Sequence, residues 1–378
     1  MRQVTNMAQK TSYEQLPVEV NQEIKKSPLI PYRLQYDPHK KSGGWWVPVV
    51  SVAVALLISA IFILFNGMNP ITVYAKMLNG AFGSTFGLSE TIVKAVPLLL
   101  CGLGVAIAYK IAIWNIGAEG QFVLGAIGAT AITIFLPDLP GGLYIPLMML
   151  GGMTAGAIWG LFTAIPRTYF KVNELITSLM LNYVALLLLD YLVYGPWRDP
   201  EGFNFPGTVI FSPFQVLANI GGTRLHIGAI FAILTVIVFA FLLAKTRWGY
   251  ELKLLGSNSI AAKNAGIKIN KHILIVMLIS GGLAGFAGAI EVSGVAERLM
   301  YGISPGYGYT AIIVAWLAKL NPWGMIVTSI FIGSLIVGGY SVQTLGLPSS
   351  FSLMLQGLIL ICLLCGEMLS KYRVSKIS

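Results

Sequence analysis

Charged residues are scarce in this chain. Asp, Glu, Lys and Arg make up 11% of its 378 residues, whereas a soluble domain carries about 25%. Hydrophobic residues account for 56% of the chain, and the mean hydropathy is +0.76. A water-soluble globular fold is excluded, because so few charges could not cover its surface. The composition therefore predicts a multi-pass membrane protein.

Residues that support catalysis or metal binding are also missing. The three cysteines, Cys101, Cys362 and Cys365, all lie inside apolar runs. The last two have CxxC spacing, but their helical setting favours small core residues over a disulfide or a zinc site. The sequence contains no GxxxxGK(S/T) phosphate loop and no HExxH motif. We therefore expect no catalytic residue, no metal and no cofactor in this chain.

Apolar runs of bilayer-crossing length predict an all-α fold with about ten transmembrane helices. On this assignment, 20 of the 25 Lys and Arg residues lie on the side of both termini. The positive-inside rule then places both termini in the cytoplasm, and it explains the net charge of +10 without nucleic-acid binding. The predicted spans are 45–66, 91–111, 120–136, 142–165, 175–194, 226–244, 273–291, 307–320, 323–340 and 350–368.

The polar ends of the chain divide it into three parts. Residues 1–44 form a polar arm broken by prolines, which buries too little apolar surface to fold alone, so we expect disorder or short local structure. Residues 45–370 form the transmembrane domain, and residues 371–378 form a cytoplasmic tail.

A polar stretch, Asn115–Gln121, interrupts two apolar runs and contains Glu119 between two glycines. One interpretation is a helix break inside the membrane, where freed backbone lines a watery cavity and the acid lies on a transport path. The other is a short cytoplasmic turn with Glu119 in water. Spacing alone favours neither.

Two cytoplasmic segments carry further signals. Asn173 is a plausible N-cap for a span in which Thr177 and Asn182 are polar, and these two either bond neighbouring helices or line a path. The loop 245–272 contains a predicted short helix at 256–266, with Ser257–Ser259 at its start. That helix either binds a partner protein or only connects the two neighbouring spans.

The second half of the chain also contains an apolar run that is interrupted by glycine and polar residues. Gly281–Ala289 is dense in small residues and predicts close helix packing. Ser304–Thr310 then opens another interrupted apolar run. Interrupted segments at corresponding places in two halves indicate a central substrate site. Spans two to five and seven to ten would form these halves as an inverted repeat.

Together, NIGAEGQ at 115–121, NELITSLMLNY at 173–183, the 256–266 loop, and Gly306–Thr310 with NPWG at 321–324 resemble a known family. They are similar to the permease subunits of bacterial ABC importers for simple sugars and nucleosides, and most similar to the nucleoside-importing members. The resemblance covers roughly residues 65–365. Trp114 departs from it, since phenylalanine is expected there.

The resemblance implies a permease in a bacterial plasma membrane that forms the path for nucleosides. It implies a second permease subunit, with a heterodimer favoured, together with cytoplasmic ATPase subunits that hold ATP and Mg and an extracellular substrate-binding lipoprotein. The implied path residues are Asn115, Glu119, Gln121, Thr177, Asn182, Tyr309 and Thr310. The implied gate or helix-cap residues are Asn173 and Glu174. The implied ATPase-coupling residues are Ser257, Asn258, Ser259, Ala261, Ala262, Lys263 and Gly266.

Three alternatives stay open at this stage. The chain could be an ABC permease for a simple sugar such as ribose or galactose. It could be a secondary transporter in which Glu119, Asp190 or Glu291 carries a coupled ion. It could also be a membrane scaffold or receptor that carries no solute.

Overall fold

The computed structural model describes residues 32–36, 44, 46–348, 350–370 and 372–376. Nine helices within these residues are long and apolar enough to cross a bilayer, which confirms the all-α multi-pass membrane fold. They are α1 (Trp46–Phe65), α3 (Thr85–Lys110), α4 (Ala118–Phe135), α5 (Gly141–Phe170), α6 (Glu174–Tyr194), α7 (Gly228–Lys245), α10 (Ile269–Glu291), α12 (Pro322–Ser341) and α13 (Ser350–Ser370).

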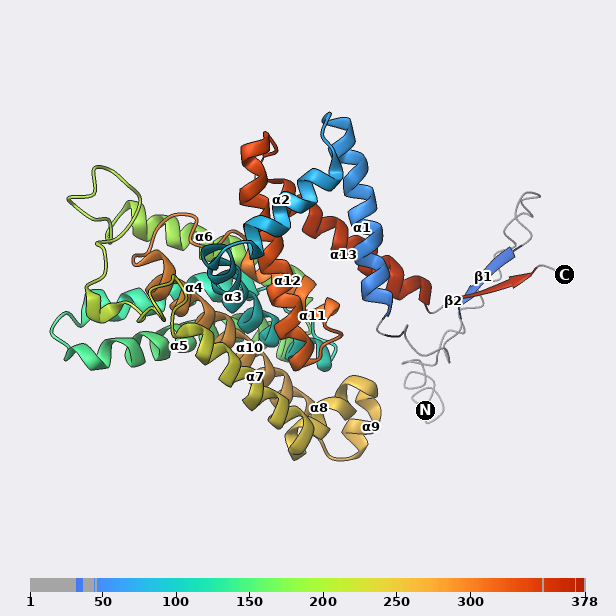
Figure 1. Ribbon diagram of the computed structural model, residues 1–378. Coiled ribbons are helices and arrows are strands. Elements are labelled where there is room, and N and C mark those ends of the chain that lie inside the picture. The colour runs from blue at the N-terminus through green and yellow to red at the C-terminus, as the bar shows by residue number, and fades with distance from the viewer. Residues whose placement is uncertain (1–31, 37–43, 45, 349, 371, 377–378) are drawn as a thin grey trace, which may run out of the picture. The chain divides into compact units, whose positions relative to one another are not determined.

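Shorter elements connect these helices (Figure 1). The helix α2 begins after the N-cap Asn69 and buries one face. The short α-helices are α2 (Pro70–Phe82), α8 (Arg247–Ser257), α9 (Ser259–Asn264) and α11 (Tyr307–Leu317). The remaining turns are η1 (Pro213–Gln215), the π-helical η2 (Val292–Ala296) and η3 (Val342–Leu345).

The prediction of a full helical span at 307–320 is wrong. The helix α11 has 11 residues, so it is about 16 Å long and covers about half of the hydrocarbon core. It cannot extend further towards its start, because Pro305 precedes it and Gly306 adopts φ +95°. At its other end, Lys319 and Leu320 adopt φ 51° and 57° and stop the helix.

The segment around α11 nevertheless connects the two sides of the transmembrane domain. Met300 forms a β-bridge with Gly207, in the long loop between α6 and α7. Lys319 donates to the carbonyl oxygen of Gly44, just before α1, and pairs with Glu367 near the end of α13. Residues 300–319 therefore run from one side of the domain to the other, partly without helical hydrogen bonds.

Glycines set the packing at the centre of the domain, where α4, α5 and α10 lie side by side (Figure 1). A Cβ atom on Gly285 would lie 2.2 Å from the carbonyl oxygen of Gly152, and one on Gly288 would lie 2.0 Å from that of Phe122. The backbones therefore touch directly, which confirms the close packing that the small residues of 281–289 predicted.

A two-stranded antiparallel sheet joins the two ends of the chain. Strand β1 (Tyr32–Tyr36) pairs with β2 (Tyr372–Lys376), with Tyr32 opposite Lys376. The strands belong to a unit separate from residues 43–367. The rest of the arm, for which we predicted disorder, lies outside the described residues.

Gly285→Ala is expected to destabilise the protein, since its added methyl group meets backbone atoms of α5 that cannot move aside alone. Overpacking of this kind costs about 1–3 kcal/mol, so the melting temperature in detergent should fall. Gly282→Ala is the matched control on the same helix, because its nearest neighbour would lie 3.6 Å away. Equal melting temperatures for the two variants would contradict the packing described here.

Candidate functional site

The chain is not helical between α3 and α4, where the polar stretch Asn115–Gln121 begins, and a transport path through this stretch stays a prediction. The helix α3 ends at Lys110 and α4 begins at Ala118. The Oδ1 atom of Asn115 accepts a hydrogen bond from the N–H of Gly117 at 3.0 Å, which forms the turn into α4. Glu119 is only 2% exposed. The alternative of a turn with Glu119 in water is therefore wrong.

The carboxylate of Glu119 lies at the N-terminus of α11. Its Oε2 atom accepts a hydrogen bond of 2.7 Å from the N–H of Gly308. The side chain of Ser304 and the backbone of Gly306 and Tyr309 also interact with this carboxyl group. Glu119 is itself in the first turn of α4, so one negative charge complements the positive ends of two helix dipoles. This arrangement compensates the cost of burying the charge.

Only glycine allows this approach of the two helices. A Cβ atom on Gly308 would lie 2.2 Å from the backbone nitrogen of Glu119. The start of α11 therefore rests directly on the first turn of α4, and the two helix breaks meet at one point.

Two amides fill the interior next to this point. Asn115 Nδ2 donates to Gln121 Oε1 at 2.9 Å, and Gln121 Nε2 donates to Asn115 Oδ1 at 3.2 Å. Asn115 Nδ2 also donates to Ser280 Oγ on α10 at 2.8 Å. Ser280 in turn donates to the carbonyl oxygen of Gly104 on α3 at 2.6 Å. The pair therefore ties the break to both neighbouring helices.

Asn182 on α6 bonds the backbone that the break leaves without helical partners. Its Oδ1 atom accepts from the N–H of Gly120 at 2.9 Å, and its Nδ2 atom donates to the carbonyl oxygen of Ile116 at 3.0 Å. Nδ2 also donates to the Tyr309 hydroxyl at 3.1 Å. Asn182 thereby connects α6 with both α4 and α11.

The structure brings five of the seven predicted path residues into one network and separates the other two from it. Thr177 donates to the carbonyl oxygen of Asn173 one turn away. Thr310 donates to Gln356 Oε1 on α13 at 3.1 Å. That any of the seven contacts solute stays a prediction. The residues in the network are Asn115, Glu119, Gln121, Asn182 and Tyr309.

Sequence reasoning missed Ser280, which bridges α3 and the amide pair. The signal was weak, since Ser280 is a single hydroxyl at the edge of a glycine-rich run. It also gave no role to Ser304, whose Oγ atom accepts from the N–H groups of Gly306 and Tyr307 and so forms the turn before α11.

The cap predicted at the start of α6 is confirmed. Asn173 Oδ1 accepts from the N–H of Leu175 at 2.9 Å. Glu174 follows in the first turn and forms an ion pair with Arg167 at 3.1 Å. A role of either residue in a gate stays a prediction.

The short helix predicted in the 245–272 loop is also confirmed, as α9 (Figure 1). Asn258 caps it by accepting from the N–H groups of Ile260 and Ala261, both at 3.0 Å. Gly266 follows with φ +80°. Upstream, a Cβ atom on Gly256 would meet the carbonyl oxygen of Lys110. The loop therefore packs against the residue at which α3 ends and the break begins.

A second polar cluster joins α3, α10 and α11. Lys94 Nζ donates to the Tyr307 hydroxyl at 2.8 Å and lies 3.4 Å from Glu291 Oε1. The Tyr307 hydroxyl donates to the same carboxylate oxygen at 3.2 Å. The sequence named Glu291 as an intramembrane acid but missed its partners, which lie far from it along the chain.

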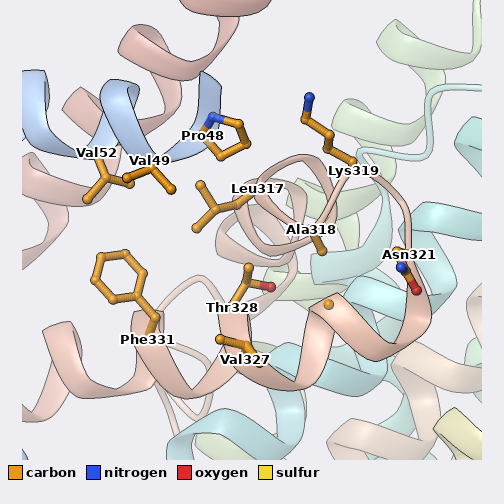
Figure 2. Close-up of a pocket in the computed structure, with 11 residues that line it drawn as sticks. Pro48, Val49, Val52, Leu317, Ala318, Lys319, Asn321, Val327, Thr328 and Phe331 are labelled. Atoms are coloured by element: carbon orange, nitrogen blue, oxygen red, sulfur yellow. The ribbon is translucent and has the colours of Figure 1, made fainter. Parts of the chain in front are cut away.

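An apolar groove lies between α1, α11 and α12 (Figure 2). Its volume is about 670 Å³. Its walls are mainly apolar, with Val49, Val52, Leu317, Val327 and Phe331 among the side chains that line it. Such walls suit an apolar occupant and do not suit a polar solute.

A helical bundle in which two broken helices meet at a buried carboxylate is the architecture of a membrane transport subunit. Residues 87–364 match the family described as branched-chain amino acid transport system / permease component. This match covers well over half of the chain, and the chain belongs to that family.

Characterised relatives are permeases of ABC transporters. The chain is 35% identical over 356 residues to the glucose ABC transporter permease protein TsgB13 of Haloferax volcanii, covering 90% of this chain and 93% of the relative. It is 33% identical over 317 residues to the guanosine ABC transporter permease protein NupP of Bacillus subtilis, covering 82% and 90%. It is 29% identical over 311 residues to the nucleoside ABC transporter permease protein NupB of Lactococcus lactis, covering 80% and 85%.

These matches confirm the family resemblance that the sequence motifs indicated. The chain is a transmembrane permease subunit of an ABC importer, and its role is transport rather than catalysis.

Glu119→Gln is expected to weaken the junction of α4 and α11. The amide removes the negative charge and can turn an N–H group towards backbone N–H donors, which costs about 1–3 kcal/mol. We expect lower thermal stability in detergent and reduced transport, with normal amounts of protein in the membrane. Glu201→Gln, an exposed acid in the α6–α7 loop, is the control. Transport by Glu119→Gln at the control level would remove Glu119 from the functional residues.

His226, just before α7, predicts a dependence of stability on pH. Burial and the nearby charge of Lys94 lower the pKa of His226 to about 4, from an ordinary value of about 6.5. Below about pH 6.5, His226 binds a proton in the unfolded chain but stays neutral in the folded protein. The free energy of unfolding therefore falls as the pH drops below about 6.5. Between pH 8 and pH 5 the expected loss is about 2 kcal/mol.

Thermal unfolding of wild type and His226→Gln at both pH values measures this loss. The variant should lose about 2 kcal/mol less than wild type on acidification, since the other titrating groups are shared. Identical losses would show that His226 does not resist protonation in the folded protein.

Proposed function

We propose that this chain forms the translocation path of an ATP-driven nucleoside importer in a bacterial plasma membrane. The observation that carries the proposal is the chemistry at the two helix breaks. Apart from Glu119, whose charge is compensated by helix N-termini, the side chains there are amides and hydroxyls, among them Asn115, Gln121, Asn182 and Tyr309. Neutral groups of this kind suit a neutral, hydroxylated solute. The guanosine and nucleoside permeases among the relatives support the same substrate class.

A simple sugar is the second candidate. It is supported by the 35% identity to a glucose ABC transporter permease, and the same amides and hydroxyls would bind sugar hydroxyls. An ion-coupled secondary transporter has less support, since Glu119 is bonded to the α11 N-terminus and Glu291 is paired with Lys94.

Energy would come from partner chains. We infer cytoplasmic ATPase subunits that hold ATP and Mg, a second permease subunit in a heterodimer, and a lipoprotein that delivers solute from outside. The missing phosphate loop in this chain supports a separate ATPase. The exposed end of α9 supports its docking site, since Ile260 is 71% exposed there.

The contacts of the 245–272 loop supply a route from that docking site to the path. The ATPase would bind at α9, which follows α8 in the loop. Gly256 in α8 contacts the carbonyl group of Lys110, and the break that leads to Glu119 begins one residue later. A displacement of α9 would therefore reach the polar junction through α8 and the end of α3.

Both termini would lie in the cytoplasm. The pairing of β1 with β2 supports this proposal, since it would bring the start of α1 and the end of α13 to the same side of the membrane. The Lys and Arg residues concentrate on that side, as the positive-inside rule expects of the cytoplasmic one.

Uptake of labelled guanosine and uridine tests the substrate class and the energy source. Cells that lack the gene should recover uptake when it is restored. The recovered uptake should persist when ion gradients are collapsed and ATP is kept. No recovered nucleoside uptake would favour the sugar candidate, whereas uptake lost with the gradients would favour ion coupling.

Ala261→Asp tests the docking site on α9. A carboxylate buried in the contact with the ATPase would lose its hydration, so we expect ATP hydrolysis that no longer responds to substrate. Asn204→Asp introduces the same charge in the exposed α6–α7 loop and is the control. Unchanged coupling in Ala261→Asp would make the loop a simple connector.

A further inference from the structure

A small pocket lies beside the start of α11. It is bounded by α11, α12, α13 and the non-helical segment before α11, and its volume is about 210 Å³. The described residues that line it supply hydroxyl, amide and aromatic groups and no charged side chain. Its polar groups include those of Tyr307, Thr310, Tyr340 and Gln356.

The amide of Gln356 in this pocket is only half satisfied. The residue is 2% exposed, and its Oε1 atom accepts from the Thr310 hydroxyl at 3.1 Å. Its Nε2 atom has no hydrogen-bond partner among the described residues. Exchanging the two ends of the amide would leave the oxygen unpaired instead, so the result does not depend on which orientation is assigned. A buried unpaired amide is unfavourable, and a ligand that bonds it would remove that cost.

The position of the pocket connects it to the transport path. Pro305 belongs to the non-helical chain that precedes α11, and such chain at membrane depth is tolerated where it lines a cavity. Thr310 follows Tyr309, whose hydroxyl is bonded to Asn182 in the central network. In transporters, solutes bind at the ends of discontinuous helices, and this pocket lies at one such end.

We propose that this pocket binds the sugar ring of the solute, with the free half of the Gln356 amide bonded to a ring hydroxyl. The volume is below the range of about 300–1000 Å³ that is typical for larger ligands, so it accepts one ring. The Thr310 and Tyr340 hydroxyls add polar partners, and tyrosine rings offer faces for the apolar side of a sugar. The uncharged lining excludes phosphorylated solutes.

This inference rests on the proposed function and extends it. Nucleosides and simple sugars share a hydroxylated ring, so one subsite would serve both classes of solute. The part of the path that recognises a nucleobase would then lie elsewhere.

Gln356→Leu tests the contact, because leucine removes the amide and keeps most of the volume. Guanosine transport by the complete importer should fall about three- to tenfold, the effect of one lost hydrogen bond. Gln343→Leu changes an exposed glutamine outside the pocket and should transport normally. Tyr340→Phe removes a single hydroxyl from a half-exposed ring, so it tests the same pocket without risk to folding.

Solutes with single hydroxyls removed separate binding from structure. Gln356→Leu should slow guanosine transport by a larger factor than it slows transport of one of the two deoxy analogues, 2′-deoxyguanosine or 3′-deoxyguanosine. That analogue is the one that lacks the hydroxyl bonded by Gln356, so it has no such bond to lose. A structural role would slow all three nucleosides by the same factor and would overturn the proposal. An unchanged guanosine rate would also overturn it.

A binding measurement on the importer in nanodiscs, without the lipoprotein, gives a second readout. Ribose should raise the melting temperature of wild type, and Gln356→Leu should abolish the rise. No rise in wild type, or equal rises in both, would overturn the subsite. If wild type binds ribose through Gln356 but carries no nucleoside, the nucleoside assignment fails and the subsite stands. If wild type carries guanosine and Gln356→Leu does so equally well, the subsite fails and the assignment stands.

Discussion

The hydrogen bond between the Glu119 carboxylate and the Gly308 N–H holds the centre of this protein together. Two helices that start in the buried interior of the protein leave several N–H groups without intrahelical partners. A carboxylate placed between their N-termini bonds donors on α11 and complements both dipoles at once. Without it, the membrane interior would contain unpaired backbone donors on one side and an uncompensated carboxylate on the other.

The remaining polar groups depend on this junction for their positions. Asn182 holds α6 to it, and the Asn115–Gln121 pair holds α10 and α3 through Ser280. The glycine contacts of α10 with α5 bring the same helices to backbone distance. The polar junction and the close packing therefore support each other, and neither could form if a larger side chain separated the helices.

Many of the helices and their starting residues were predictable from the sequence, because they depend on signals within a short stretch of chain. The lengths of the apolar runs predict most of the transmembrane spans. Asn173 and Asn258 act as N-caps that mark the starts of α6 and α9. The break at Asn115–Gln121 was visible as polar residues and glycines between apolar runs, but its burial was not. Whether Glu119 lies in water or in protein is decided by α11, nearly 190 positions away along the chain.

The errors and omissions have the same cause. A run of apolar residues predicted a full span at 307–320, although backbone conformations at Gly306 and Lys319 limit the helix to α11. Lys94 and Ser280 were missed because a single polar residue in an apolar helix gives no sign of its partner. The half-satisfied amide of Gln356 exists only through the neighbouring α11 and so leaves no trace in the sequence. Inverted symmetry of the two halves stays a prediction, although both contain a break after their first long helix.

The sheet formed by β1 and β2 has a consequence for the biosynthesis of the protein. Tyr32 pairs with Lys376, so almost the whole chain separates the two strands. During synthesis β1 is made before all the membrane helices, and its partner is made only after α13. The sheet can therefore form only after every preceding helix has been synthesised.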